Sequence, residues 1–138
     1  MSSLKLSSIL LSFLLCTQAL AESWVKISEA KGGDEYFYDQ YSISRTGSLI
    51  SFTLVINYQN PKSNIFSDRS DTVIDCMKDQ SKTLNLISYS QHNLKGNVLY
   101  KASYPDAVWI RAPYNTVLYG IEQKICELNL SNPIKVQT

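Results

Sequence analysis

The chain has 138 residues, of which 44% are hydrophobic and 18% are charged, and its formal net charge is +1. This weak charge gives no basic surface of the kind that nucleic-acid-binding proteins use, so we expect no nucleic acid as a partner. Nine tyrosines beside only five glycines and four prolines are typical of a β-rich folded domain and not of a disordered chain.

The first 21 residues predict a signal peptide. Lys5 gives a positive start, Ile9 to Leu15 are almost all apolar, and Ala19-Leu20-Ala21 has the small-x-small pattern of a signal-peptidase site. The apolar run is shorter than the roughly 20 residues of a membrane-spanning helix, and no later run is longer. A retained membrane anchor is the alternative. We therefore expect an exported, non-cytoplasmic protein with no membrane span after cleavage and a single domain at 22–138, with its core at about 24–128.

Three cysteines are present, and the predicted cleavage after Ala21 removes Cys16. A lipid anchor on Cys16 is disfavoured, because Leu15 stands where a lipoprotein signal needs a small residue. The remaining pair, Cys76 and Cys126, most simply forms one disulfide in an exported chain. Such a bridge would close a loop of about 50 residues and contribute roughly 4 kcal/mol. Two free thiols or a shared metal ion are the alternatives, although the chain lacks a CxxC motif and has one histidine.

The first half of the mature chain predicts two short strands and one long strand. Short strands are expected at Trp24–Ile27 and Tyr36–Tyr38, each followed by turn residues, and Ile43–Arg45 follows the second turn. After a turn at Gly47, the even positions of Leu49–Tyr58 are all apolar and the odd positions are mostly polar. This period of two predicts a strand with one buried face.

The second half predicts more strands that are separated by turns. Asn60–Asn64 predicts a loop, and Ser70–Cys76 predicts a strand. Thr83–Ser90 is also strand-like, but its imperfect alternation indicates either a bulge or two partly covered faces. Asn97–Ala102 predicts the strand that returns beside it, and Ala107–Ile110 is a candidate for one more short apolar element.

A helix is predicted at the C-terminus, where Asn115 or Thr116 can cap its first turn. It should end or bend near Cys126, so that the sulfur can reach Cys76. Many strands followed by one helix predict an α+β fold, a predominantly antiparallel sheet with the C-terminal helix packed on it. Five apolar residues fall on one stripe of this helix: Val117, Leu118, Ile121, Ile125 and Leu128.

Signals for chemistry are weak. His92 is the only histidine and lies in a predicted turn, so we interpret it as a solvated turn residue, with a hydrolytic general base as the minor alternative. No serine stands in a G-x-S-x-G elbow. Asp68, Asp71 and Asp75 form a loose acidic group with too few ligands for calcium. We therefore expect neither an enzyme nor a bound metal or cofactor.

Lysines and tyrosines gather around the predicted hairpin of Thr83–Ser90 and Asn97–Ala102. Such side chains suit the recognition of proteins or glycans, although ordinary solvated lysines beside half-buried tyrosines are the alternative. An exposed edge of the sheet would also allow a homodimer. The predicted ligand-contact surface consists of Lys78, Lys82, Lys95, Lys101 and Tyr100, with Tyr89 and Tyr104 nearby.

The chain from about Trp24 to Cys126 resembles the bacterial surface-adhesin protein E family. The resemblance rests on these residues, in order: Trp24, Tyr38-Asp39, Ser42-Ile43, Gly47, Asp75-Cys76, Tyr89-Ser90, Gly96, Trp109-Ile110, Pro113 and Cys126. It implies an antiparallel sheet with a C-terminal helix, a Cys76–Cys126 disulfide and export in a Gram-negative bacterium.

The resemblance also implies adhesion, since named members of the family bind host extracellular-matrix and serum glycoproteins. The named adhesin type is a lipoprotein, whereas this chain has Leu15 before Cys16. We therefore keep two hypotheses. The first is a non-enzymatic adhesin-like domain that contacts a host glycoprotein, and the second is a periplasmic protein that contacts a protein of the bacterial envelope.

Overall fold

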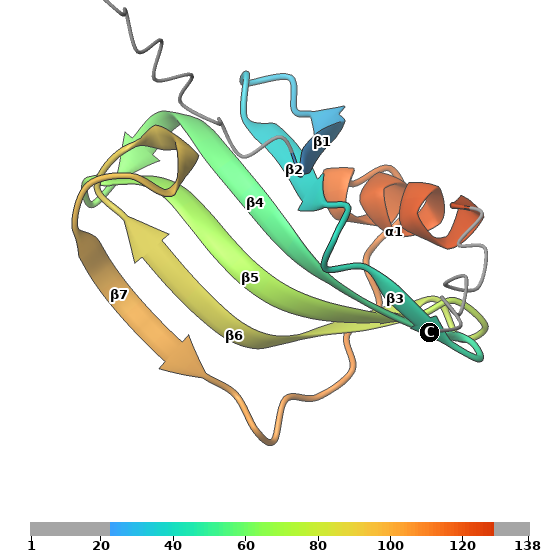
Figure 1. Cartoon of the computed structure of the whole chain (residues 1–138). Helices are drawn as coiled ribbons and strands as arrows, with labels where there is room; N and C mark the ends of the chain where they lie inside the picture. Colours follow the sequence, from blue (N-terminus) through green and yellow to red (C-terminus); the bar gives the residue numbers. More distant parts are fainter. Residues whose placement is uncertain (1–22, 129–138) are drawn as a thin grey trace, which may run out of the picture.

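The computed structural model describes residues 23–128. The predicted signal peptide, Cys16 and the C-terminal tail lie outside the described residues. Within them, the chain forms a seven-stranded antiparallel sheet and one α-helix, which confirms the α+β class (Figure 1).

The strands follow one another mostly as hairpins. The sheet order is β1-β2-β4-β5-β6-β7, with β3 pairing β4 outside this path, and a single-turn 3-10 helix, η1, joins β6 to β7. The bounds are β1 Trp24–Glu29, β2 Glu35–Asp39, β3 Ser44–Thr46, β4 Leu49–Lys62, β5 Ile65–Asp75, β6 Gln80–Tyr89, η1 His92–Leu94, β7 Val98–Ser103 and α1 Val117–Glu127.

The β4–β5 hairpin is longer than the sequence predicts. The expected loop over Asn60–Asn64 is wrong, because β4 continues to Lys62 and the chain reverses at Ser63 and Asn64 alone. Both turn residues have the positive φ of tight hairpin turns, 53° and 61°. Pro61 is tolerated in the strand because the β4–β5 register is irregular between Asn57 and Lys62, where no regular ladder bond is lost.

The core lies between α1 and one face of the sheet. The even positions of β4 that the alternation places inside are buried, including Ile50 and Phe52, and they pack with Ile121 and Ile125 of the helix. The opposite face is not fully exposed as expected. Val55 is buried there, because it lies in register between Phe37 of β2 and Arg69 of β5 on an inner strand.

Two expectations for the second half have clear outcomes. The bulge in β6 is confirmed, since Thr83 pairs with Thr72 and Asn85 pairs with Asp71, which leaves Leu84 as the extra residue. The candidate for one more short apolar element over Ala107–Ile110 forms neither a strand nor a helix. Within this segment only Ile110 forms a bridge, to Ser81, and its side chain stays largely exposed.

Thr116 caps the first turn of α1, and a disulfide joins the last turn of α1 to the sheet, as the sequence predicts. Thr116 Oγ1 accepts a hydrogen bond from the Tyr119 backbone N–H at 3.2 Å. Cys76 and Cys126 form a disulfide with their Cα atoms 5.8 Å apart, which joins the end of β5 to the last turn of α1. Arg45 adds a hydrogen bond of 2.9 Å to the Cys126 carbonyl, so this end of the helix is held by both covalent and polar contacts.

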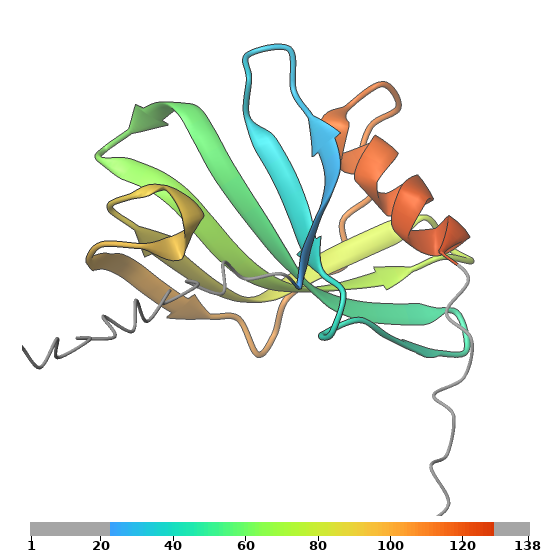
Figure 2. The ribbon, with the colours of Figure 1, turned by 45° about the horizontal axis from the view of Figure 1, so that its top comes forward.

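The position of α1 leaves part of the sheet without a helix. Figure 2 shows α1 beside β1 and β2, while β7 lies at the other side of the curved sheet. β6 begins under α1, where Ser81 contacts Glu122, and runs away from the helix toward its other end. Lys124 Nζ donates a hydrogen bond of 2.8 Å to the Ile27 carbonyl of β1, which holds α1 at that side. The inner face of β6 is therefore open next to the helix.

Candidate functional site

The residues of the predicted contact surface are spread along the last two strands. Lys78 lies in the β5–β6 turn, and Lys95 follows η1 at the other end of β6. Because β6 has 10 residues, these two lysines stand about 30 Å apart along the strand direction. Lys82 lies in β6 with Nζ 4.6 Å from the centre of the Trp109 ring, in a cation–π contact, and Lys101 lies in β7. The four lysines thus lie on or beside β6 and β7, but they do not form one cluster.

Strand β7 forms the outer edge of the sheet at this side. Its apolar side chains are unusually open, since Val98 is 55% exposed, Leu99 45% and Tyr100 49%. The Tyr104 N–H donates to the Leu84 carbonyl at 2.7 Å and so points toward β6. Because backbone groups alternate in direction along a strand, the N–H and C=O of Lys101, three residues earlier, point away from β6. Among the described residues, no strand pairs with this edge. β7 therefore presents free backbone donors and acceptors between apolar side chains.

A groove lies next to this edge, between α1 and the open face of β4, β5 and β6. Its volume is about 430 Å³, which is within the usual size of small-molecule pockets. Tyr104 lines it from the side of β7, and its hydroxyl is hydrogen-bonded to that of Tyr100, which raises the pKa of Tyr104. Most of the lining surface is apolar, and Ser70, Thr72, Ser81 and Thr83 add hydroxyl groups to it. The apolar residues include Phe52, Leu54, Ile56, Leu86, Ile110 and Leu118.

One carboxylate lines this groove. Glu122 of α1 is only 2% exposed, and its Oε1 accepts a hydrogen bond of 2.6 Å from the Ser81 hydroxyl of β6. Its Oε2 is buried without a hydrogen-bond partner among the described residues. Burial raises the pKa of Glu122, the Ser81 hydrogen bond opposes that rise, and the nearby Asp79 carboxylate adds to it. The groove thus combines a mostly apolar lining with one carboxylate oxygen that lacks a donor.

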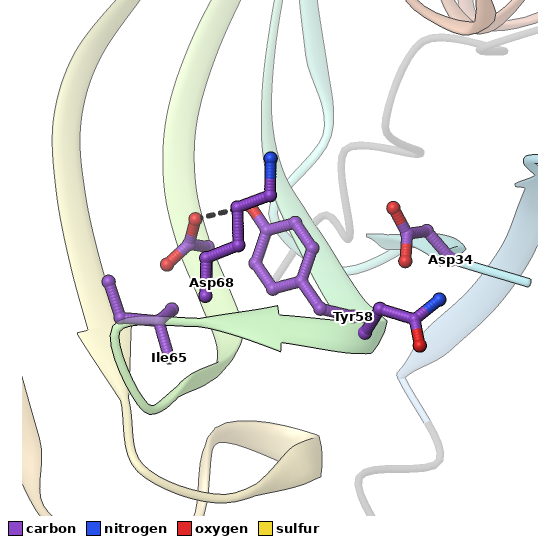
Figure 3. A pocket seen from close by; sticks show the side chains of 6 residues that line it. Asp34, Tyr58, Ile65 and Asp68 are labelled. Carbon is purple, nitrogen blue, oxygen red and sulfur yellow. Dashed lines mark hydrogen bonds between the residues drawn. The ribbon is translucent and has the colours of Figure 1, made fainter. Parts of the chain in front are cut away.

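A second hollow, of about 350 Å³, lies at the far end of the β4–β5 hairpin. Figure 3 shows the Tyr58 hydroxyl pointing toward Asp68, and the two form a hydrogen bond of 2.5 Å. Burial, followed by this hydrogen bond, raises the pKa of Tyr58, so the phenol keeps its proton and acts as a donor. Asp34 and Lys62 also line the hollow. With Asp68, two carboxylates and one ammonium group line the hollow, so acidic groups predominate there.

The candidate catalytic and metal residues have other partners. His92 Nε2 lies 2.8 Å from the Tyr58 carbonyl, and its ring meets that of Phe66 edge-on at 5.2 Å. Asp75 Oδ1 accepts hydrogen bonds from two backbone N–H groups of the β5–β6 turn. Asp71 accepts one from Thr53 at 3.2 Å. Within residues 23–128, no three His, Cys, Asp or Glu side chains lie close enough to hold a metal ion.

The family model for surface-adhesin protein E matches residues 24–127, almost all of the described chain. The chain belongs to the surface-adhesin protein E family. As a member of this family it has an adhesin-like role and is an exported or cell-surface protein, and the family favours binding over catalysis. No helix within residues 23–128 is long and apolar enough to cross a membrane.

Solved structures of protein E from Haemophilus influenzae share this fold. The crystal structure from a non-typeable strain is 19% identical, with a TM-score of 0.53 over 76% of this chain and 76% of that chain. Crystal form II is 19% identical, with a TM-score of 0.55 over 76% of this chain and 87% of that chain. The selenomethionine form is 20% identical, with a TM-score of 0.53 over 76% and 86%. A search of curated proteins finds no match.

Proposed function

We propose that this member of the protein E family is a non-enzymatic binding domain that holds an extended segment of a partner protein along β7. The observation that carries the proposal is the outer edge of β7, with its free backbone groups and exposed apolar side chains. An added strand gains affinity from main-chain hydrogen bonds and specificity from alternate side chains. Soluble proteins usually protect such an edge with charges, prolines or bulges. β7 has one lysine, Lys101, and a register shift near Tyr100, but three neighbouring apolar side chains stay exposed, which favours a binding role.

The lysines of the predicted surface would guide an acidic partner toward this edge. Lys101 lies on β7 itself, and Lys82 is on the neighbouring strand with its ammonium held over Trp109. Lys78 and Lys95 mark the two ends of β6. Exposed charges of this kind act mainly on the association rate, and their effect weakens with salt. Charge reversal at these four positions should therefore slow association, most strongly at low ionic strength.

The partner proposed first is a host extracellular-matrix or serum glycoprotein, in keeping with an adhesin-like role. A protein of the bacterial envelope is the second candidate, because Leu15 before Cys16 disfavours a lipid anchor. Cell fractionation combined with protease treatment of intact cells separates the two. Digestion of the protein on whole cells supports a host ligand, whereas full protection with recovery in the periplasm supports an envelope partner.

The edge itself is tested by two substitutions at one position. Lys101→Ala removes the charge and keeps the outward N–H, whereas Lys101→Pro also removes the N–H that an added strand would use. The Lys101 N–H points away from β6, so the proline costs no ladder bond of the sheet. Binding of the purified domain to immobilised vitronectin and laminin is measured for both variants.

We expect Lys101→Ala to weaken binding only a few-fold and Lys101→Pro to weaken it about tenfold or more, since at least one main-chain hydrogen bond is lost. Circular dichroism and urea unfolding confirm that both variants are folded. Equal affinities for the proline and alanine variants would remove the β7 edge as the binding site. If charge reversal of the four lysines weakens binding strongly and Lys101→Pro does not, the partner binds the charged side chains and not the strand edge.

A further inference from the structure

The groove beside α1 has a feature that binding along the β7 edge does not use. Glu122 lines this groove and is only 2% exposed, and its Oε2 atom accepts no hydrogen bond from any of the described residues. Leaving a buried polar atom unpaired is costly, and an ionised one costs more. A helix face that only packed against the sheet would be expected to carry an apolar residue here.

We propose that this groove binds a small amphipathic amine, a molecule with an apolar body and one cationic head group. The apolar lining would cover the body, and the head group would lie next to the Glu122 carboxylate. The volume of about 430 Å³ suits one such molecule and is small for a folded partner. This proposal is independent of the β7 edge and of the identity of the protein partner.

The charges around Glu122 favour a cation over an anion or a neutral head. None of the ion pairs within residues 23–128 includes Glu122. Asp79, in the β5–β6 turn, adds negative potential, which appears as a contribution to the raised Glu122 pKa. Lys82 also lines the groove, but its Nζ is held over the Trp109 ring. Opposite charges attract more strongly in such apolar surroundings than in water, so a nearby ammonium group would stabilise the ionised carboxylate.

The groove is tested first with a fluorescent probe, N-phenyl-1-naphthylamine, whose emission rises in apolar surroundings. Purified wild-type domain should enhance the emission in a saturable way. Leu86→Trp fills the groove from β6 and should abolish the enhancement. Leu49→Trp adds the same bulk to β4 at an exposed position outside the groove and should leave the enhancement unchanged.

The head group is tested by displacing the probe with octylamine, 1-octanol and octanoate, which share one chain length. At neutral pH we expect octylamine to bind about tenfold more tightly than octanol, as a charge-assisted contact would give, and octanoate to bind weakest. Glu122→Gln keeps the size of the side chain and its contact with Ser81 but loses the charge. In this variant the preference for the amine should fall to less than about threefold.

Three results would overturn the proposal. The first is that wild-type protein does not enhance the emission of the probe. The second is that the folded Leu86→Trp variant still enhances this emission. The third is an amine preference that survives Glu122→Gln unchanged. Because Glu122→Gln is nearly isosteric and is read out as a ratio of affinities, a moderate change in stability does not mask the outcome.

Discussion

Removing the disulfide between Cys76 and Cys126 should weaken the fold without dismantling it. The bridge joins residues 50 positions apart, and closing a loop of that length contributes about 4 kcal/mol in the chain-entropy model. A domain of this size has a total stability of about 5–15 kcal/mol, so the loss is a large part of the whole. The double variant Cys76→Ser/Cys126→Ser should therefore unfold at clearly lower urea concentrations.

The helix should nevertheless stay docked in the folded state of that variant. With 11 residues, α1 is too short to be stable alone, and it depends on its contacts with the sheet. Ile121 and Ile125 are both fully buried, and their burial contributes about 3–6 kcal/mol together. The Arg45 hydrogen bond to the Cys126 carbonyl does not depend on the sulfur atoms either.

Urea unfolding followed by tryptophan fluorescence measures this effect, because Trp24 lies in β1 and Trp109 lies between β7 and α1, with its ring next to Lys82 of β6. Wild-type protein reduced before unfolding serves as the control and should match the double variant. A loss of less than about 1 kcal/mol would refute the reasoning, since even a bridge that stabilises less than theory predicts should exceed that. Two free thiols in the exported wild-type protein would refute it as well.

Three further predictions follow from single residues. Burial raises the pKa of Glu122 in the folded state, so the protonated form supports the fold below the ordinary pKa, and this support is lost as pH rises through the folded-state pKa. The Tm of Glu122→Gln relative to wild type should therefore rise between about pH 4 and pH 8, and a constant difference would contradict this. Ile125→Ala should cost about 2–5 kcal/mol in urea unfolding, because the side chain is completely buried; a loss below about 1 kcal/mol would show that it does not pack in the core. Gly96 and Gly47 both have positive φ, but a Cβ on Gly96 would come within 2.3 Å of the Ser90 hydroxyl, whereas Gly47 is open. Gly47→Ala should cost about 1–2 kcal/mol and Gly96→Ala distinctly more, and equal costs would mean that the contact relaxes freely.

The regular patterns of the sequence predicted the local structure well. The alternation over Leu49–Tyr58 and the helical stripe from Val117 identify the inner face of β4 and the packed face of α1, because both patterns depend on residues close in sequence. The extent of the β4–β5 hairpin was missed. Asn60 and Pro61 are turn formers, yet the reversal needed only Ser63 and Asn64, and the pairing across the whole hairpin extends both strands.

The candidate sites depended on contacts that no local pattern contains. β7 is an edge because of the strand order, which the sequence of β7 does not specify. Glu122 did leave a signal, since it stands four residues after Leu118 and three before Ile125, inside the apolar stripe. The sequence alone could not show that Glu122 lines a groove. That depends on where α1 packs on the sheet, because this position leaves the inner face of β6 open beside the carboxylate.

The central claim is that a partner segment pairs with the outer edge of β7. Amide hydrogen exchange of the domain, alone and bound to the glycoprotein that the binding panel selects, tests this most directly. The account predicts that exchange at the outward amides of Lys101 and Ser103 slows on binding, while amides in the middle of β4 stay unchanged. Binding that leaves exchange at these two amides unaltered would contradict it.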